Sequence, residues 1–166
     1  IFENLDRAYT NGSDKEARKN MLRASYFAGC AFTKSYVGYV HAVAHTLGGQ
    51  YNVPHGLANA VILPFVLEEY GKTIYSKLAR LAQAAGVADS DTSEEVAAKA
   101  FIQAIKDMKK RFSIGDYIPE IQETDIPELA HYADKEANPL YPVPVLMDAG
   151  ELETLYYRLM PPAGSC

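Results

Sequence analysis

The amino-acid sequence predicts an all-α domain. Apolar residues recur at helical spacings over most of the 166 residues, and helix start and stop signals bound these stretches. Residues 55–70 are apolar almost all round, which is typical of a central helix buried on most sides. The only β-like stretch, residues 143–146, is short and bounded by prolines. Because 48% of the residues are hydrophobic, we expect one core and a single domain over residues 1–166.

The first helices are predicted from capping and glycine signals. Ser13 with Glu16 forms a capping-box pattern, so we expect a helix to begin at Ser13. The next helix, over residues 39–47, is predicted to end at Gly48 and Gly49, because glycine tolerates left-handed backbone. Apolar residues of the first helix, three to five positions apart, predict a broad buried stripe of Ala17, Met21, Leu22, Phe27, Ala28, Ala31 and Phe32.

Two further helices are predicted in the middle of the chain. The apolar helix over residues 55–70 contains Pro64, which is predicted to kink or divide it. An amphipathic helix follows over residues 74–85 and stops at Gly86. These features predict a core built around residues 55–70.

The rest of the chain is predicted as one long helix and two short ones. Thr92 with Glu95 forms a second capping-box pattern, which opens a helix that continues to about residue 112. Several prolines after Gly115 divide the remainder into short pieces, of which residues 127–135 and 148–159 have helical patterns. No internal repeat or low-complexity tract interrupts this order.

Charge and composition exclude several classes of function. The net charge is −5. The single basic run consists of Lys106, Lys109, Lys110 and Arg111. It lies late in a predicted helix, where cations suit the negative end of the helix dipole. We therefore expect no nucleic-acid surface. No stretch of eighteen apolar residues and no secretory signal is present, so we expect a cytoplasmic protein without a membrane segment. Cys30 and Cys166 lie far apart, and we expect no disulfide framework.

The segment with the most candidate functional residues covers residues 38–59 and reads GYVHAVAHTLGGQYNVPHGLAN. His41 and His45 are four residues apart, so on a helix they share one face with Cβ atoms about 5–6 Å apart. A chain reversal after them can bring His55 back to that face, and converging imidazoles suit Fe, Co, Ni, Cu or Zn better than Mg or Ca. Buried histidines hydrogen-bonded to backbone carbonyls explain the pattern equally well, so the residues alone leave both interpretations open.

The same segment resembles a known family. The run GYVHAVAHTLGGQYNVPHGLANAVILPFVLEEYG is similar to the signature of the iron-containing (group III) alcohol dehydrogenases, with its His-x-x-x-His, Leu-Gly and Pro-His-Gly elements. A fainter similarity continues through IPELAHYADKEANPLYPVPV. The resemblance implies the multi-helix C-terminal domain of the dehydroquinate synthase-like fold, as the C-terminal half of a longer enzyme whose N-terminal nucleotide-binding domain is absent from this chain.

The resemblance also implies a role for each histidine. It assigns the metal to His41 and His55, and it places His45 beside the substrate and nicotinamide, as a catalytic and cofactor-binding residue linked to proton relay. The family's other two metal ligands form an Asp-x-x-x-His pair, which this chain lacks: no histidine precedes His41, and the aspartates before it are Asp6 and Asp14. The implied metal site is therefore half of a site. Asn59 is interpreted mainly as a polar packing residue, with a contact beside the metal as the alternative.

The resemblance implies a metal-dependent oxidoreductase. The intact enzyme would interconvert a primary alcohol and an aldehyde by hydride transfer with NAD or NADP, using Fe²⁺ (Zn²⁺ in some members) at the substrate oxygen. Its expected partners are the small alcohol or aldehyde, its own N-terminal domain and further copies in a homo-oligomer, and this chain alone is expected to be inactive. The alternative is a non-catalytic helical metal-binding or interaction module. A zinc hydrolase is disfavoured because no glutamate adjoins the histidines as a general base.

Overall fold

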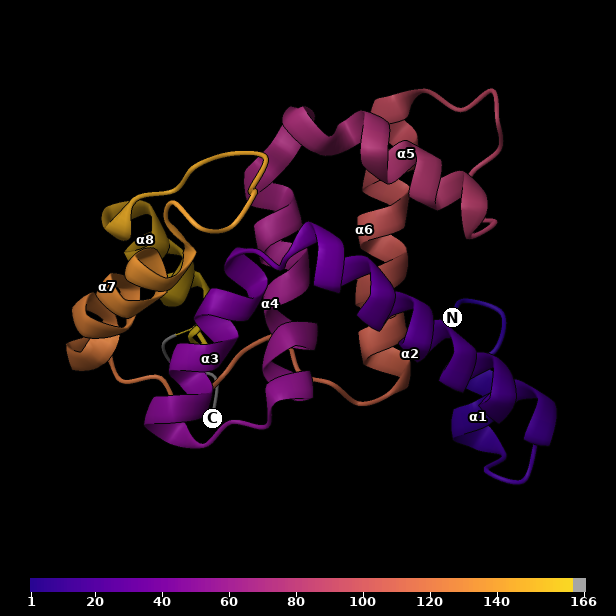
Figure 1. Ribbon diagram of the computed structural model, residues 1–166, viewed down its shortest axis with the longest axis horizontal. Helices are drawn as coiled ribbons and strands as arrows, with labels where there is room; N and C mark the ends of the chain where they lie inside the picture. Colours follow the sequence, from indigo (N-terminus) through magenta and orange to yellow (C-terminus); the bar gives the residue numbers. More distant parts are fainter. Residues whose placement is uncertain (163–166) are drawn as a thin grey trace. The chain divides into compact units, whose positions relative to one another are not determined.

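The computed structural model describes residues 1–162 and contains, within that range, eight α-helices and two short 3₁₀ helices but no β-strand (Figure 1). The predicted all-α class is therefore confirmed, and residues 143–146 form no strand. The chain separates into two compact units, Ile1–Val37 and the residues from Gly38 onward, and each is described by itself. Among the described helices, none combines the length and apolar character needed to cross a membrane.

The first unit contains helices α1 (Leu5–Thr10) and α2 (Lys15–Ser35). The N-cap of α2 is Asp14 and not the predicted Ser13, because the Asp14 carboxylate accepts a hydrogen bond of 3.0 Å from the backbone N–H of Ala17. This hydrogen bond holds the pKa of Asp14 below its ordinary value. The helix thus begins one residue later than its capping pattern suggested.

The apolar stripe predicted on α2 is not buried. Ala17 is the one residue of α2 that is buried, although the apolar spacing is helical as expected. The reason is the small size of its unit, since the six-residue α1 can cover only a small part of a 21-residue helix. Large exposed side chains on α2 are Leu22, Tyr26, Phe27 and Phe32. Cys30 of α2 is exposed with a free thiol, and Cys166 lies outside the described residues.

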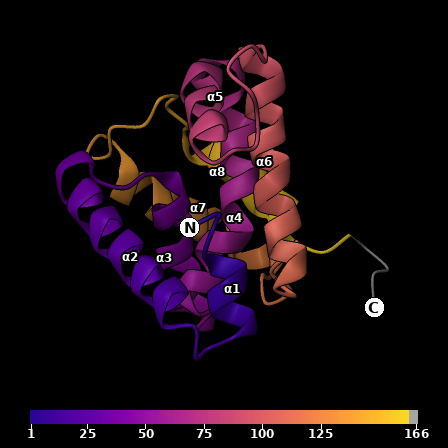
Figure 2. The ribbon, with the colours of Figure 1, turned by 90° about the vertical axis from the view of Figure 1, so that its right-hand side faces the viewer.

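The second unit is arranged around one central helix. Helix α4 (His55–Tyr70) packs against α3 (Tyr39–Tyr51), α6 (Glu94–Arg111) and α8 (Ala149–Leu159). Helix α7 (Ile126–Ala137) packs between α3 and α8. Figures 1 and 2 show α4 and α6 side by side, with α3, α7 and α8 together beyond α4. The prediction that residues 55–70 form the core helix is confirmed.

Helix α3 runs through the two glycines predicted to end it. Gly48 and Gly49 are helical, and α3 ends at Tyr51. The left-handed residue is Asn52, with φ 58°, whose N–H donates to the carbonyl of Gly48. Asparagine can occupy this conformation, and a glycine in a helix costs only about 1 kcal/mol relative to alanine, so packing decides where the helix stops.

Pro64 does not divide α4, which is one helix from His55 to Tyr70. Proline removes one backbone hydrogen bond from a helix. The packing of α4 compensates for this loss, because α4 contacts three other helices and buries Ala58, Val61, Ile62, Pro64 and Val66. Burial of an apolar surface on this scale outweighs one missing hydrogen bond.

Helices α5 and α6 pack against each other beside α4. The predicted helix over residues 74–85 is a 3₁₀ turn, Gly71–Ile74, followed by α5 (Tyr75–Ala84). The N-cap of α6 is Ser93 and not the predicted Thr92, since the Ser93 hydroxyl accepts from the N–H of Val96. In both α2 and α6, the residue after the predicted N-cap can also cap a helix, and the backbone geometry selects this second residue.

A buried tyrosine ties the C-terminal loop to α3. The hydroxyl of Tyr39, a residue with no exposed surface, donates to Asn138 Oδ1 at 2.8 Å and accepts from the N–H of Met147 at 2.9 Å. The side-chain amide of Asn138 donates to the Met147 carbonyl at 2.9 Å. These bonds hold both ends of the loop between α7 and α8, which fixes where the intervening residues lie.

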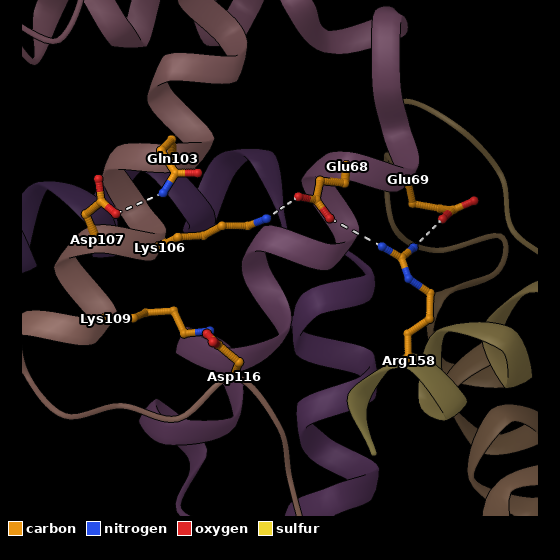
Figure 3. A network of polar contacts seen from close by, with 8 residues as sticks. All are labelled: Glu68, Glu69, Gln103, Lys106, Asp107, Lys109, Asp116 and Arg158. Atoms are coloured by element: carbon orange, nitrogen blue, oxygen red, sulfur yellow. Dashed lines mark hydrogen bonds and ion pairs between the residues drawn. The ribbon is translucent and has the colours of Figure 1, made fainter. Parts of the chain in front are cut away.

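Ion pairs join the end of α4 to α6 and α8 (Figure 3). Glu68 lies between two cations, Lys106 of α6 and Arg158 of α8, and Arg158 also contacts Glu69 at 2.8 Å. On α6, the side chain of Lys109 is only 4% exposed, and its Nζ lies 3.2 Å from Oδ1 of Asp116. Two residues of the basic run thus pair within the chain.

Replacing Asp148 by alanine is expected to destabilise the second unit by about 0.5–2 kcal/mol, because it removes the N-cap of α8. Asp148 accepts from the N–H of Glu151 at 2.9 Å, and the Glu151 carboxylate accepts from the N–H of Asp148 at 2.9 Å, which completes a capping box. Urea unfolding measures the change. Asp148→Asn keeps a capping oxygen and is the control; equal losses in both variants would contradict the capping role.

Candidate active site

The three histidines of the signature come from two adjacent helices. His41 and His45 are one helical turn apart on α3, and His55 is the first residue of α4. The left-handed Asn52 and the N-cap Pro54 reverse the chain between these helices, which pack against each other. The predicted return of His55 to the face of His41 and His45 is what this turn produces.

The three imidazole rings form one cluster. Ring centroids are 6.0 Å apart for His41 and His45, 5.4 Å for His41 and His55, and 5.3 Å for His45 and His55. The rings of His45 and His55 are stacked, with an interplanar angle of 18°. His41 is half-buried, whereas His45 and His55 are exposed. The cluster therefore opens to solvent on the side of His45 and His55.

Burial lowers the pKa of His41 below its ordinary value. Repulsion from His55 and His45 lowers this pKa further, and the nearby carboxylate of Glu136 opposes the change. A lowered pKa keeps His41 neutral over a wider range of pH. Neutral imidazole is the form that binds a metal, so the direction of the shift favours a ligand role.

Glu136 of α7 contacts the cluster and was not predicted from the sequence. Its Oε1 lies 2.7 Å from Nδ1 of His45, and the hydroxyl of Tyr141 donates to the same oxygen at 2.7 Å. Burial and the bond to Glu136 raise the pKa of Tyr141 to about 12. In the sequence, Glu136 looks like one more polar residue of an amphipathic helix, because its partner is 91 residues away.

Asn59 binds His55 directly. Its Nδ2 donates to the backbone carbonyl of His55 at 2.8 Å and lies 3.1 Å from Nε2 of the ring. Its Oδ1 is buried without a hydrogen-bond partner. Asn59 is therefore a polar neighbour of the histidine cluster.

The donor set suits a transition metal but is small. Imidazole nitrogens are ligands that Fe²⁺ and Zn²⁺ accept, and the two rings assigned to the metal, His41 and His55, lie close together. Within residues 1–162, however, no group of three or more histidine, cysteine, aspartate or glutamate side chains is placed to hold a metal ion. The residues present thus fit part of a metal site.

The main cavities of the described residues lie away from this cluster. A cavity of about 240 Å³ between α3 and α7 is lined by Thr46, Gly49, Gln50, Asp125, Glu128, Leu129 and Tyr132. None of the three clustered histidines lines it. The histidine cluster is thus separate from this cavity, and two of its rings, those of His45 and His55, are exposed.

Comparison with known proteins agrees with this fold. The model of the Fe-containing alcohol dehydrogenase family, C-terminal, matches residues 1–160. A 1,3-propanediol dehydrogenase of Citrobacter freundii is 39% identical over 140 residues, which cover 83% of this chain and 36% of that protein. The crystal structure of a 1,3-propanediol oxidoreductase superimposes with a TM-score of 0.88 at 35% identity, covering 96% of this chain and 42% of that one.

A third relative was solved with a nucleotide. The sulfoacetaldehyde reductase of Bifidobacterium kashiwanohense, in complex with NAD⁺, superimposes with a TM-score of 0.80 at 26% identity, over 99% of this chain and 41% of that one. The chain belongs to the Fe-containing alcohol dehydrogenase family and corresponds to its C-terminal domain. It spans about a third of the length of the first curated relatives it matches, which are 1,3-propanediol dehydrogenases.

Proposed function

We propose that the chain is the metal-binding part of an oxidoreductase that interconverts a primary alcohol and an aldehyde by hydride transfer with NAD or NADP. The observation that carries the proposal is the convergence of three imidazoles from α3 and α4, inside a segment that matches the family model. The nucleotide would be held by an N-terminal domain, and the whole enzyme would form a homo-oligomer. The names of the relatives support the class of reaction but not a particular substrate.

In this proposal His41 and His55 hold Fe²⁺, with Zn²⁺ as the alternative. When bound there, the ion supplies positive charge to the substrate oxygen, which stabilises a developing alkoxide. Burial of His41 keeps its ring neutral and ready to bind. Asn59 steadies His55 through its hydrogen bond to the backbone carbonyl and its contact with the ring.

His45 would move the proton. It is exposed and held at Nδ1 by Glu136, so its other nitrogen, Nε2, remains to accept a proton from the alcohol side and pass it to solvent. Its stacked position on His55 keeps it beside the proposed metal ligands. The chain therefore contributes proton transfer and substrate-oxygen positioning, whereas hydride transfer requires the nucleotide.

The second candidate is a helical metal-binding or interaction module without catalysis. Its interaction role is favoured by the large apolar side chains that α2 exposes, which include Leu22, Phe27 and Phe32. The two candidates differ in what a nucleotide-binding domain adds: catalysis requires one, whereas a module binds its metal or partner without it.

The chain alone is expected to show no NAD(P)-linked alcohol oxidation, because it holds two proposed metal ligands and no glycine-rich phosphate loop. Fusing it behind the N-terminal domain of the Citrobacter freundii relative is expected to give turnover of primary alcohols, followed by NAD(P)H absorbance. In that fusion His45→Ala should lower kcat by on the order of 10²–10⁴-fold. Turnover by the chain alone, or a fusion unaffected by His45→Ala, would contradict the proposal.

A further inference from the structure

Glu136 contacts the histidine cluster from a different helix. Its Oε1 lies 2.7 Å from Nδ1 of His45, and the two side chains retain 32% and 44% of their exposed surface. The contact joins α7 to α3, whose packing fixes the distance between the two side chains.

Glu136 lies at the edge of the buried face of α7. Its neighbours Ala133 and Ala137 are buried, whereas the Glu136 side chain is 32% exposed. A carboxylate that is partly buried loses some of its hydration, which hydrogen-bond donors can replace.

Tyr141 is one of these donors. Its hydroxyl donates to Oε1 of Glu136 at 2.7 Å, and its pKa, raised to about 12, keeps the hydroxyl protonated at neutral pH. Tyr141 lies in the loop that Tyr39 and Asn138 tie to α3. The loop therefore holds the carboxylate oxygen against His45 and restricts the rotation of the Glu136 side chain.

We infer that Glu136 is a positioning residue that keeps the proton of neutral His45 on Nδ1 and leaves Nε2 as the proton acceptor. An ionised carboxylate can only accept hydrogen bonds, so its bond to Nδ1 requires a proton on that nitrogen. The stacked ring of His55 limits rotation of His45 from the other side. This inference rests on the proposed role of His45 in proton transfer, because that role needs one free acceptor nitrogen.

The test is the tautomer of His45, measured in the metal-free chain by long-range ¹H–¹⁵N NMR at a pH where histidine is neutral. The wild-type chain is expected to show His45 protonated on Nδ1. Glu136→Leu is expected to move His45 to a mixture or to the Nε2-protonated form, because the acceptor is gone. Glu128→Leu is the matched control, since it makes the same change at an exposed site of the same helix.

The outcomes separate clearly. A change at His45 in Glu136→Leu but not in Glu128→Leu, with His131 unchanged in both spectra, supports the inference. An unchanged His45 in folded Glu136→Leu overturns it. If Glu136→Leu does not fold, Glu136→Gln takes its place, since it keeps the shape of the side chain but removes its charge. Glu136→Gln is expected to give a mixture of His45 tautomers. An unchanged His45 tautomer in this variant again overturns the inference.

A kinetic measurement ties the tautomer to proton transfer. In the fusion with the N-terminal domain, Glu136→Gln is expected to lower kcat by about 10–100-fold with KM unchanged, because substrate binding does not use the His45 proton. Equal kcat in the unmodified fusion and in its Glu136→Gln variant would overturn the positioning role of Glu136. Failure of the proposed function is distinguishable, because the unmodified fusion would then show no turnover while the NMR result would be unaffected.

Discussion

Replacing His41 by alanine is expected to abolish the weak binding of Zn²⁺, or of Fe²⁺ without oxygen, by the 166-residue chain. His41 and His55 are the two proposed ligands, with ring centroids 5.4 Å apart, and a single remaining imidazole holds a divalent ion poorly. His55→Ala should have the same effect. Calorimetric titration at neutral pH measures both variants. A tight stoichiometric site in the unmodified chain would contradict the half-site.

His45→Ala is the control for this experiment. By spacing alone, His41 and His45 would be the metal pair, whereas the family resemblance assigns the metal to His41 and His55. His45→Ala is therefore expected to bind metal as the unmodified chain does. If His45→Ala loses binding and His55→Ala keeps it, the assignment from the resemblance is wrong and the pair on α3 is the ligand set.

Replacing Tyr156 by alanine is expected to cost about 3–5 kcal/mol, which is a large part of the usual stability of a domain. Tyr156 has no exposed surface and lies on α8, and its hydroxyl is hydrogen-bonded to Thr46 of α3. The Thr46 hydroxyl lies within hydrogen-bond distance of the carbonyl of Val43 (2.8 Å), and the Tyr156 hydroxyl of the carbonyl of Leu129 (3.4 Å). Removing the ring leaves a cavity where α8 faces α3 and α7.

Tyr156→Phe separates the ring from its hydroxyl. It keeps the packing and removes the hydrogen bond, so the expected cost is about 1 kcal/mol. Burial raises the pKa of Tyr156, which keeps the hydroxyl protonated and donating over the usual range of pH. Urea unfolding followed by circular dichroism measures both variants. Equal losses from Phe and Ala would mean that the hydrogen bond, and not the packed ring, supplies the stability.

Helix positions were predictable because their signals are local. Apolar periodicity placed α4, α5, α6 and the two C-terminal helices to within a few residues. The errors were also local: both capping boxes were placed one residue early, at Ser13 and Thr92, and α3 was ended at its glycines. In each case neighbouring residues offer the same capping or stop chemistry, so the backbone geometry decides between them.

Burial was less predictable than helicity. The pattern on α2 is amphipathic, yet Leu22 and Phe27 are 74% and 61% exposed. A pattern identifies the face that a helix can bury, but burial needs a partner of sufficient size. In the second unit α4 has three such partners, and most of its apolar residues are buried or half-buried.

The sequence by itself determined the all-α class, the central helix and the histidine cluster. The cluster was readable because its members lie within 15 residues, where a helical turn and a chain reversal bring them together. Only the tertiary structure decided what surrounds it. Glu136 and Tyr156 meet α3 from 91 and 110 residues away, and such contacts depend on how whole helix faces pack and not on hydrogen bonds within one turn.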